Sequence, residues 1–456
     1  MSGSYKFSLD PVAVPTVQTQ HREIKTSIPS PGTREIVERL SVVESRSMHG
    51  QIPLVWDKAI DYNVYDRAGN KWIDFTSTIF VANVGHSNQR VLDRIAEELS
   101  KPILGCYAYP NETRAEYLEA LIRFAGKPFE KAFLLSAGTE TTEAAIKLMR
   151  LNGRKLGKKK GGIISFSGNW HGRTLGAQQL SNNQSQRDWI FSPDPDIHFL
   201  PFPYPWEISE KDGREFFLNS LQNLLRSGID LESDICGVML ETFQGWGAFF
   251  YPKSFVKAVR EVCDRFSILM CFDEMQAGFA RTGKKFGFEH YDVTPDLFCC
   301  GKGMGGGLPL SGVVGRSDLM DLPEIGNMSS THSGNPIMCA AGLAVMEEIT
   351  TNELVEAAQN KGVLFEELLA NLVLKFPKIL KATYGKGLIR SLVFQDQIGE
   401  YSGSSYASNF SELCFRLGVL VVHTGRESVK LGPPLTIPVD AIEESVSVME
   451  MALLQI

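Results

Sequence analysis

Short apolar runs and amphipathic stretches follow one another through the middle of the chain. The amphipathic stretches predict helices at 88–100, 112–126 and 139–155, because their apolar residues recur at helical spacing. The apolar runs are of strand length and lie between turn residues. They predict strands at 132–136, 162–166, 198–202, 235–242, 267–272 and 296–300. Helices that alternate with strands indicate an α/β fold on a mostly parallel sheet.

The two ends of the chain have a different pattern. Residues 1–28 are polar and contain two prolines, which predicts a loose or partner-stabilised arm. Thr33 is a candidate N-cap of a helix with an apolar stripe of Ile36, Val37 and Leu40. Residues 55–75 combine short apolar runs with turn residues, which predicts an antiparallel meander.

The last third of the chain begins with two helical stretches. Helical periodicity continues from Pro336 to about residue 348, and again over 353–376. Strands are expected near 388–394, 418–423 and 428–432. This part of the chain therefore predicts a smaller α+β lobe.

Composition narrows the class of protein. With 456 residues and 43% hydrophobic residues, the chain can bury a large core. A net charge of −7 argues against nucleic-acid binding, which needs a basic face. No apolar run is long enough to span a membrane, and the N-terminal residues lack a secretory pattern. The eight cysteines are scattered without metal-ligand spacing, so we expect free thiols, a cytoplasmic protein and no metal.

Two of the expected strands lead to a charged residue. Residues 268–272 run into Asp273, and residues 297–300 are followed by Lys302 and a glycine-rich tract. Strand ends of an open α/β sheet form the crevice where ligands bind. A desolvated lysine is a nucleophile toward carbonyls, and a carboxylate holds positive charge on a ring nitrogen; pyridoxal phosphate needs both. The alternative is a solvated loop lysine and a helix-capping aspartate.

The surrounding sequence resembles a known family. FDEMQAGFARTGK at 272–284 and KGMGGGLPL at 302–310 are similar to motifs of the class-III, ornithine/4-aminobutyrate-type aminotransferases. The resemblance extends over roughly residues 30 to 450. It implies transfer of an amino group between an amino donor and a keto acid, ketone or aldehyde, with pyridoxal 5′-phosphate as cofactor. The alternative on the same fold is an epimerase, decarboxylase or aminomutase.

The resemblance also implies an architecture. It is that of a fold-type-I pyridoxal-phosphate-dependent transferase, in which a large domain with a mostly parallel seven-stranded sheet joins a small α+β domain built from both chain ends. The implied segments are an N-terminal arm at 1–28, a first part of the small domain at 29–78, the large domain at 79–336 and the rest of the small domain at 337–456. A homodimer with shared active sites is implied as well.

Three residues receive catalytic or ring-binding roles from the resemblance. Lys302 forms a Schiff base with the cofactor and later moves a proton. Asp273 keeps the ring nitrogen protonated. Gln276 donates a hydrogen bond to the ring's 3′-oxygen.

The phosphate site is predicted at the start of a helix. LLSAGTETTE at 134–143 joins a strand to a helix through small residues, and helix N-termini bind anions. An ordinary capping turn has the same pattern. The resemblance assigns Gly138 and Thr139 to the phosphate, together with Thr331 from the neighbouring subunit.

The remaining cofactor contacts come from two motifs. SGNWHGRT at 167–174 is similar to the family's aromatic-His-Gly-Arg-Thr element. The similarity implies that Trp170 stacks on the cofactor ring, that His171 binds the cofactor, and that Arg173 binds the substrate. ETFQGWG at 241–247 resembles another motif of the family, which implies that Glu241 lies beside the cofactor. The alternative for Trp170 is a tryptophan at the rim of the site.

The substrate-binding candidates depart from the family pattern. Trp246 occupies the place of a gating glutamate, and Lys430 that of a carboxylate-binding arginine. A lysine is a point charge without the planar fork of an arginine, so carboxylate recognition is expected to be atypical. Arg426 lies four residues upstream and is an alternative carboxylate ligand. Ile79 and Phe80 are candidates for lining the substrate pocket, or else ordinary core residues.

Overall fold

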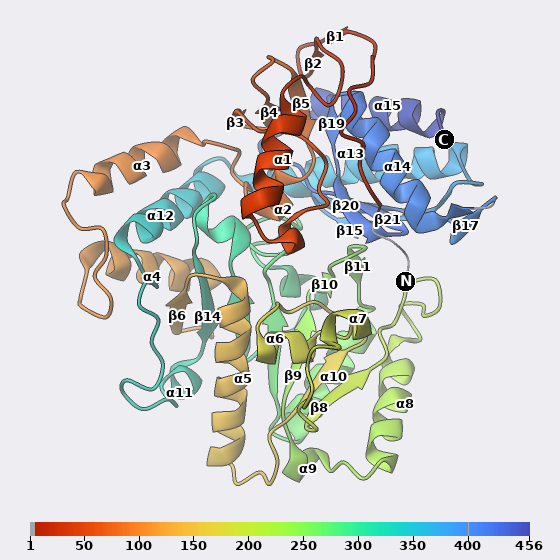
Figure 1. Cartoon of the computed structure of the whole chain (residues 1–456). Helices are drawn as coiled ribbons and strands as arrows, with labels where there is room; N and C mark the ends of the chain where they lie inside the picture. Colours follow the sequence, from red (N-terminus) through yellow and green to blue (C-terminus); the bar gives the residue numbers. More distant parts are fainter. Residues whose placement is uncertain (1–4, 400) are drawn as a thin grey trace. The chain divides into compact units, whose positions relative to one another are not determined.

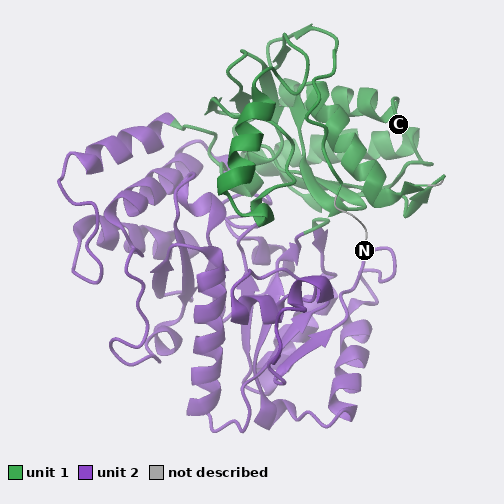
Figure 2. Cartoon of the chain, viewed as in Figure 1, with its two compact units in different colours: residues 1–88, 246–248, 356–456 green, residues 89–245, 249–355 purple. Residues whose placement is uncertain are grey.

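The computed structural model describes residues 5–399 and 401–456. The chain divides into two compact units (Figure 2). The first unit contains residues 1–88, 246–248 and 356–456, and the second contains residues 89–245 and 249–355. The domain boundaries expected after residues 78 and 336 both lie earlier in the chain than the unit boundaries, which follow residues 88 and 355.

The second unit is built on a seven-stranded sheet. Four parallel pairs and two antiparallel pairs give the order β6-β14-β13-β12-β9-β7-β8 (Figure 1). The strands are β6 (Lys131–Leu135), β14 (Ser311–Gly315), β13 (Leu297–Cys300), β12 (Leu269–Asp273), β9 (Ile235–Glu241), β7 (Gly162–Phe166) and β8 (Ile197–Leu200). Only β14 runs antiparallel to its two neighbours within this sheet, so the predicted, mostly parallel seven-stranded sheet is confirmed.

Helices and a short hairpin complete the second unit. The helices are α3 (Gln89–Leu99), α4 (Glu112–Ala125), α5 (Gly138–Lys155), α6 (Leu175–Leu180), α7 (Gln184–Arg187), α8 (Gly213–Arg226), α9 (Leu231–Asp234), α10 (Lys253–Arg265), α11 (Ser317–Met320) and α12 (Pro336–Thr351). The 3₁₀ turns are η2 (Gly287–Tyr291) and η3 (Lys302–Gly305), and the hairpin strands are β10 (Phe243–Gln244) and β11 (Phe249–Phe250). The three helices expected before residue 160 are therefore present as α3, α4 and α5.

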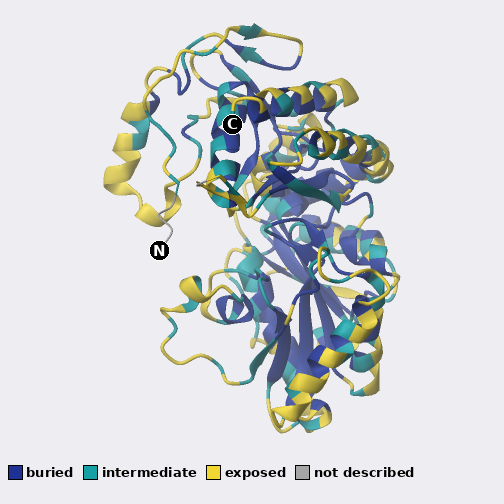
Figure 3. Cartoon of the chain, turned by 90° about the vertical axis from the view of Figure 1, so that its right-hand side faces the viewer, coloured by how far each residue is buried: buried dark blue, intermediate teal, exposed yellow. Residues whose placement is uncertain are grey.

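The two faces of this sheet bury different side chains. Alternate residues of a strand point to opposite faces. Leu269 and Cys271 of β12 belong to the apolar cluster that includes α5 residues such as Leu148. Phe272 points the other way and stacks on Tyr291 of η2, with the ring centroids 6.0 Å apart. Figure 3 shows these strands as buried, as expected for a sheet that is covered on both faces.

The first unit contains two larger sheets. One combines β1 (Val17–Gln18), β2 (Glu23–Ile24), β3 (Lys58–Ile60), β4 (Asn63–Tyr65), β5 (Lys71–Asp74) and β19 (Val419–Leu420). The other has the order β15-β16-β21-β20, with β15 (Leu380–Lys386), β16 (Ile389–Phe394), β21 (Ser428–Leu431) and β20 (Val422–Arg426). The meander expected at 55–75 is confirmed as the antiparallel strands β3, β4 and β5. The prediction of a single strand near 418–423 is wrong, because this segment forms two strands, β19 and β20, that belong to different sheets.

Helices of the first unit come from both parts of the chain. They are α1 (Thr33–Val43), η1 (Arg46–Met48), α2 (Ser77–Phe80), α13 (Leu354–Lys375), α14 (Gly403–Arg416) and α15 (Val439–Leu453), with a small hairpin of β17 (Gln397–Ile398) and β18 (Tyr401–Ser402). The first two residues of α13 belong to the second unit. Thr33 is not the N-cap of α1: that position is Gly32, with φ of 87°, and Thr33 is the first helical residue.

The polar N-terminal segment is packed from β1 onward instead of loose. Ile24 and Ile28 are fully buried, and they belong to a core cluster with Trp72 and Phe415. The indole nitrogen of Trp72 donates to the Phe415 carbonyl at 2.8 Å. Residues far apart in sequence thus form one core within this unit.

The segment α2 is a left-handed turn. Ser77, Thr78, Ile79 and Phe80 have φ values of 44°, 54°, 60° and 67°. For L-residues this conformation costs about 1–2 kcal/mol per residue, so the surrounding contacts must hold it. Ser77 Oγ donates to the Gly432 carbonyl at 2.6 Å, which ties the turn to the residue after β21.

Among the described residues, none of the helices combines the length and the apolar character needed to cross a bilayer.

Candidate active site

The candidate site lies at the carboxyl ends of the parallel strands in the second unit. Asp273 ends β12 and is paired in register with Glu241, the last residue of β9. On the other side, Asp273 is paired with Cys299 of β13, three residues before Lys302. Parallel strands end at the same edge of a sheet. This edge therefore brings two carboxylates and one lysine together.

The lysine sits on an unusual backbone. Lys302 has a φ of 45°, in the left-handed region, at the start of η3. The preceding Gly301 has no room for a side chain, because a Cβ there would lie 2.7 Å from Met275 Sδ. The glycine thus lets the chain pass close to Met275 before the lysine enters the pocket.

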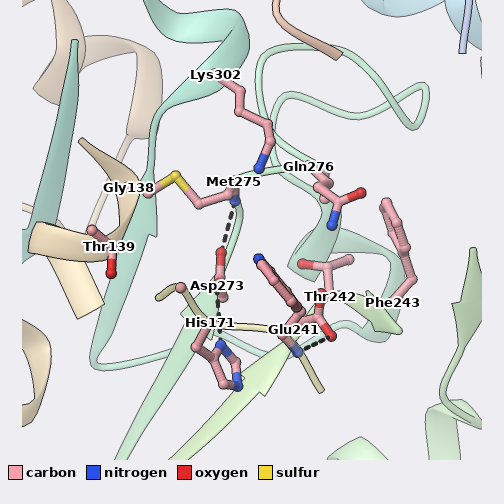
Figure 4. Close-up of a pocket in the computed structure, with 13 residues that line it drawn as sticks. Gly138, Thr139, His171, Glu241, Thr242, Phe243, Asp273, Met275, Gln276 and Lys302 are labelled. Carbon is pink, nitrogen blue, oxygen red and sulfur yellow. Dashed lines mark hydrogen bonds and ion pairs between the residues drawn. The ribbon is translucent and has the colours of Figure 1, made fainter. Parts of the chain in front are cut away.

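Asp273 is oriented by two hydrogen bonds (Figure 4). Its Oδ2 lies 2.9 Å from His171 Nδ1, and its Oδ1 accepts from the Met275 amide at 3.0 Å. His171 Nε2 lies 3.3 Å from Asn169 Nδ2, an amide donor. A histidine that accepts at Nε2 carries its proton at Nδ1 and donates it to the carboxylate. This chain of contacts fixes the Asp273 side chain.

Burial changes the acidity of Lys302. Desolvation lowers the pKa of Lys302 below its ordinary value, and the negative charges of Asp273 and Glu241 partly oppose this. A lysine with a lowered pKa has a larger fraction of neutral amine near pH 7. The pocket thus favours the nucleophilic form.

The N-terminus of α5 supplies an anion site beside these groups. The first amides of a helix have no carbonyl partner within the helix and carry a partial positive charge. Glu140 accepts from the Ser136 and Ala137 amides at 3.0 and 2.9 Å, which fixes the turn before Gly138. A Cβ at Gly138 would lie 2.8 Å from Met275 Sδ, so a side chain there would have to displace the methionine.

A hydroxyl cluster extends the anion site. Thr139 Oγ1 lies 2.7 Å from Thr174 Oγ1 and accepts from the Arg173 and Thr174 amides at 3.3 and 3.2 Å. A Cβ at Gly172, where φ is 137°, would lie 2.3 Å from the same Thr139 oxygen. The loop after β7 and the start of α5 are therefore fitted to each other.

The aromatic wall comes from the same loop. The Trp170 amide donates to Glu241 Oε2 at 3.0 Å, which joins the loop to the end of β9. Arg173 stacks on the Trp170 ring with its guanidinium carbon 4.4 Å from a ring centre. Glu241 thus positions the tryptophan backbone.

A cavity of about 170 Å³ connects these groups. It is lined by Gly138, Thr139, Trp170, His171, Gly172, Glu241, Thr242, Phe243, Asp273, Met275, Gln276, Ala277 and Lys302. Every cofactor-binding candidate predicted from the sequence is in this set except Thr331. Gly172, Thr242, Phe243, Met275 and Ala277 were not predicted; Met275 could have been found from its place between Asp273 and Gln276.

The other predicted residues lie elsewhere. Thr331 is exposed in the segment between α11 and α12 of the second unit, and Arg173 is exposed above Trp170. Ile79, Phe80, Trp246, Arg426 and Lys430 all belong to the first unit. Ile79 is 43% exposed, whereas Phe80 is 1% exposed and is a core residue.

The donor set fits pyridoxal phosphate. A buried lysine amine, a fixed carboxylate, an aromatic wall and a helix N-terminus match the aldehyde, the ring nitrogen, the ring face and the phosphate of that cofactor. The fold and this pocket together define a pyridoxal-phosphate-dependent enzyme of fold type I.

Comparison with known proteins gives the family. The model of the aminotransferase class-III family matches residues 45–453. The chain is 31% identical over 402 residues to a probable 4-aminobutyrate aminotransferase of Bacillus subtilis (strain 168), covering 86% of this chain and 90% of that protein. It is 32% identical over 422 residues to the mitochondrial ornithine aminotransferase of Oryza sativa subsp. japonica, covering 91% and 84%. The protein belongs to the class-III aminotransferases.

A solved structure supports the fold. The ornithine aminotransferase of Toxoplasma gondii superimposes with a TM-score of 0.81 at 22% identity, covering 92% of this chain and 94% of that one. The recognition from the sequence is confirmed: the protein is an aminotransferase that uses pyridoxal 5′-phosphate.

Proposed function

We propose that Lys302 and Asp273 carry the chemistry of this aminotransferase. The supporting observation is that the pocket of the second unit holds both groups beside the N-terminus of α5. Bound pyridoxal phosphate supplies a reactive carbonyl and an electron-accepting ring. Lys302 Nζ would hold the cofactor at that carbonyl and would move the proton at the Cα of the amino donor. Asp273 holds a proton on the ring nitrogen.

The other pocket residues bind and orient. The amides of Gly138 and Thr139 bind the phosphate, Trp170 covers the ring face, and Gln276 donates to the ring oxygen. His171 positions Asp273 through its Nδ1 proton, and Glu241 positions Trp170. These assignments propose a role for each pocket residue in the reaction of the family.

The lysine assignment is tested by trapping. Lys302→Ala should fold but give no borohydride-reducible adduct with pyridoxal phosphate, measured by mass spectrometry. Lys285→Ala, which removes a lysine on the outer side near Phe124, is the control and should retain the adduct. An adduct that survives in Lys302→Ala would contradict the assignment.

Substrates are proposed from the relatives. Their names point to 4-aminobutyrate and ornithine as first amino donors to assay, with a keto acid or an aldehyde as acceptor. Trp246 and Lys430 make the recognition of the donor's carboxylate atypical, because a fork-shaped arginine is missing at position 430. Appearance of the amino group on the acceptor distinguishes transfer from epimerisation or decarboxylation.

We further propose a cytoplasmic homodimer with shared active sites. Exposed apolar side chains on α1 support the dimer: Val42 is 84% exposed and Val43 83%. Patches of this kind mark interaction surfaces. Thr331 is then the residue that reaches the phosphate of the neighbouring subunit. The eight cysteines are free thiols, which suits a reducing compartment.

A further inference from the structure

Glu143 lies in the second turn of α5, and its carboxylate contacts the loop that follows β7. Its Oε1 accepts from the Gly176 amide at 2.9 Å and from the Ala177 amide at 3.1 Å. Thr174 Oγ1 lies 2.5 Å from the same oxygen. An oxygen that accepts from two amides is an acceptor toward a hydroxyl as well, so the Thr174 hydroxyl donates to Glu143.

The direction of this hydrogen bond fixes the direction of the next one. A threonine hydroxyl has one proton, and that of Thr174 is used on Glu143. Thr139 Oγ1, which lies 2.7 Å from Thr174 Oγ1, must therefore be the donor between the two hydroxyls. The Thr139 oxygen also accepts from the Arg173 and Thr174 amides at 3.3 and 3.2 Å. One donated and two accepted hydrogen bonds exhaust the capacity of a hydroxyl, so the Thr139 side chain has no proton left for a phosphate oxygen.

Two glycines let the loop pack closely against α5. A Cβ at Gly176 would lie 2.2 Å from Glu143 Oε2, and a Cβ at Gly172 would lie 2.3 Å from Thr139 Oγ1. The segment between the two glycines contains Arg173, whose guanidinium stacks on the aromatic wall of the pocket. The contacts with α5 therefore hold a segment that also carries part of that wall.

The charge of Glu143 cannot itself favour an anion. Among the residues that the structure describes, its hydrogen-bond donors are the Thr174 hydroxyl and the two amides at the start of α6. A carboxylate repels a phosphate, so any contribution of Glu143 to phosphate binding has to come from the loop that it holds. The alternative is a residue that only caps the short helix α6 and has no effect on the cofactor.

We propose that Glu143 is a positioning residue for the phosphate of the cofactor. Through Thr174 it turns the Thr139 hydroxyl toward the loop, and it holds the loop against the start of α5. The phosphate then binds to the backbone amides of Gly138 and Thr139, while the Thr139 side chain supports the site without donating to the anion. The inference rests on the proposed function, because it takes the phosphate to bind at the N-terminus of α5.

The test compares a ligand with and without the phosphate. Apoenzyme is titrated by calorimetry with pyridoxal phosphate and with pyridoxal, and the dissociation constant of pyridoxal is divided by that of pyridoxal phosphate. Glu143→Ala should lower this ratio roughly tenfold, the lower end of the range for a hydrogen bond to a charged group. Thr174→Val removes the same link at an exposed position and should also lower the ratio. It carries the test if Glu143→Ala does not fold.

Conservative variants separate positioning from charge. Glu143→Gln keeps an acceptor oxygen for the loop and removes the charge, so it should retain the wild-type ratio within about threefold. Thr174→Ser keeps the hydroxyl and should do the same. Glu116→Ala is the matched control, because it removes an exposed glutamate of α4 that pairs with Arg94 at 3.4 Å. It should leave both dissociation constants unchanged.

A double variant tests the direction of the Thr139 hydroxyl. Glu143→Ala and Thr139→Val break the same chain of hydrogen bonds. Together they should therefore lower the ratio no further than the stronger single variant, within about twofold. If the Thr139 hydroxyl donated to the phosphate, the two losses would be independent and would multiply.

Each failure has a distinct signature. The positioning role is overturned by an unchanged ratio in Glu143→Ala or Thr174→Val, by losses that multiply in the double variant, or by a loss in Glu143→Gln as large as that in Glu143→Ala. All of these outcomes leave the phosphate site in place. If wild type binds pyridoxal as tightly as pyridoxal phosphate, the phosphate site of the proposed function itself fails, and the inference fails with it.

Discussion

The neighbouring carboxylates Asp273 and Glu274 have opposite environments. Asp273 faces the pocket, whereas Glu274 is fully buried and accepts from the Gly287 and Phe288 amides at 2.7 and 2.8 Å and from the Thr242 hydroxyl. Both residues are acidic and lie next to each other at the end of β12, so the pattern of apolar and polar positions cannot distinguish them. The register of β12 decides which one lines the pocket, because successive side chains point to opposite faces.

Glu274 gives a prediction on stability. Desolvation raises the pKa of Glu274 from 4.5 to about 7. The folded protein therefore holds this proton to a higher pH than the unfolded chain, and the carboxyl destabilises the fold progressively as pH rises from 4.5 to about 7. The free energy of unfolding of Glu274→Gln, relative to that of wild type, should therefore increase by up to about 3 kcal/mol between pH 5 and pH 8. Denaturant unfolding at both pH values measures this; a constant difference contradicts it.

Asp273 gives a prediction on catalysis. Asp273→Asn removes the charge that pairs with a protonated ring nitrogen, and loss of one such electrostatic partner commonly costs about a hundredfold in rate or more. The variant should still bind cofactor through α5 and Lys302 while kcat falls by at least that factor. Glu274→Gln is the matched neighbour and should stay within a few-fold of wild type. Equal rates for Asp273→Asn and wild type would remove Asp273 from the mechanism.

At the scale of elements, the pattern of apolar and polar positions located the helices and strands that have strong periodicity. The apolar run of β13 and the amphipathic stretch of α5 were predicted within a residue of their observed bounds. β14 was missed because its sequence, Ser311 to Gly315, continues a glycine-rich tract and has only two β-branched residues. α14 was missed because several serines, weak helix formers, interrupt its apolar stripe. In both cases tertiary packing determines the element.

The junction of α5 with the loop after β7 gives an element-scale prediction. Gly172→Ala would place a Cβ 2.3 Å from Thr139 Oγ1 and displace the hydroxyl cluster beside the helix N-terminus. The dissociation constant of pyridoxal phosphate, titrated into apoenzyme by fluorescence, should rise at least tenfold, about 1.4 kcal/mol.

Gly126→Ala is the control for that change. Gly126 also has a positive φ, 76°, but a Cβ there would meet open space at the end of α4. It should lower stability by about 1 kcal/mol through backbone strain and leave cofactor affinity unchanged. Equal affinities in both variants would show that the fit between Gly172 and Thr139 is not needed for binding.

At the scale of the whole molecule, α1 tests the dimer. Val43→Asp places a charge in the exposed apolar surface of α1, which should prevent association and lower activity together if sites are shared. Leu374→Asp on α13, at a side chain that is 77% exposed, is the control and should remain dimeric and active. Sedimentation velocity with parallel assays measures both. A dimeric Val43→Asp, or a fully active monomer at high dilution, would rule out the proposed interface.

The surroundings of the substrate-binding candidates were the least predictable part of the molecule. Single motifs placed Asp273, Lys302 and Trp170 because each lies beside a strand end of one sheet. Arg426 packs on Trp246, and Lys430 packs on Phe80. Those contacts join segments more than 150 residues apart in sequence, and a local pattern carries no information on them.

The discontinuity of the first unit determines the order in which the chain can fold during synthesis. Residues 89–355 form the second unit almost without interruption, so the ribosome delivers that unit complete before α14 exists. β5 can pair with its parallel partner β19 only after Val419 and Leu420 have been synthesised. Likewise, Trp72 can stack on Phe415 only after that residue has been added to the chain. The first 88 residues thus remain without most of their core while the following domain folds. A nascent chain stalled near residue 400 should therefore expose Trp72 and Ile73 to chaperones, and release of the final helices should end that exposure.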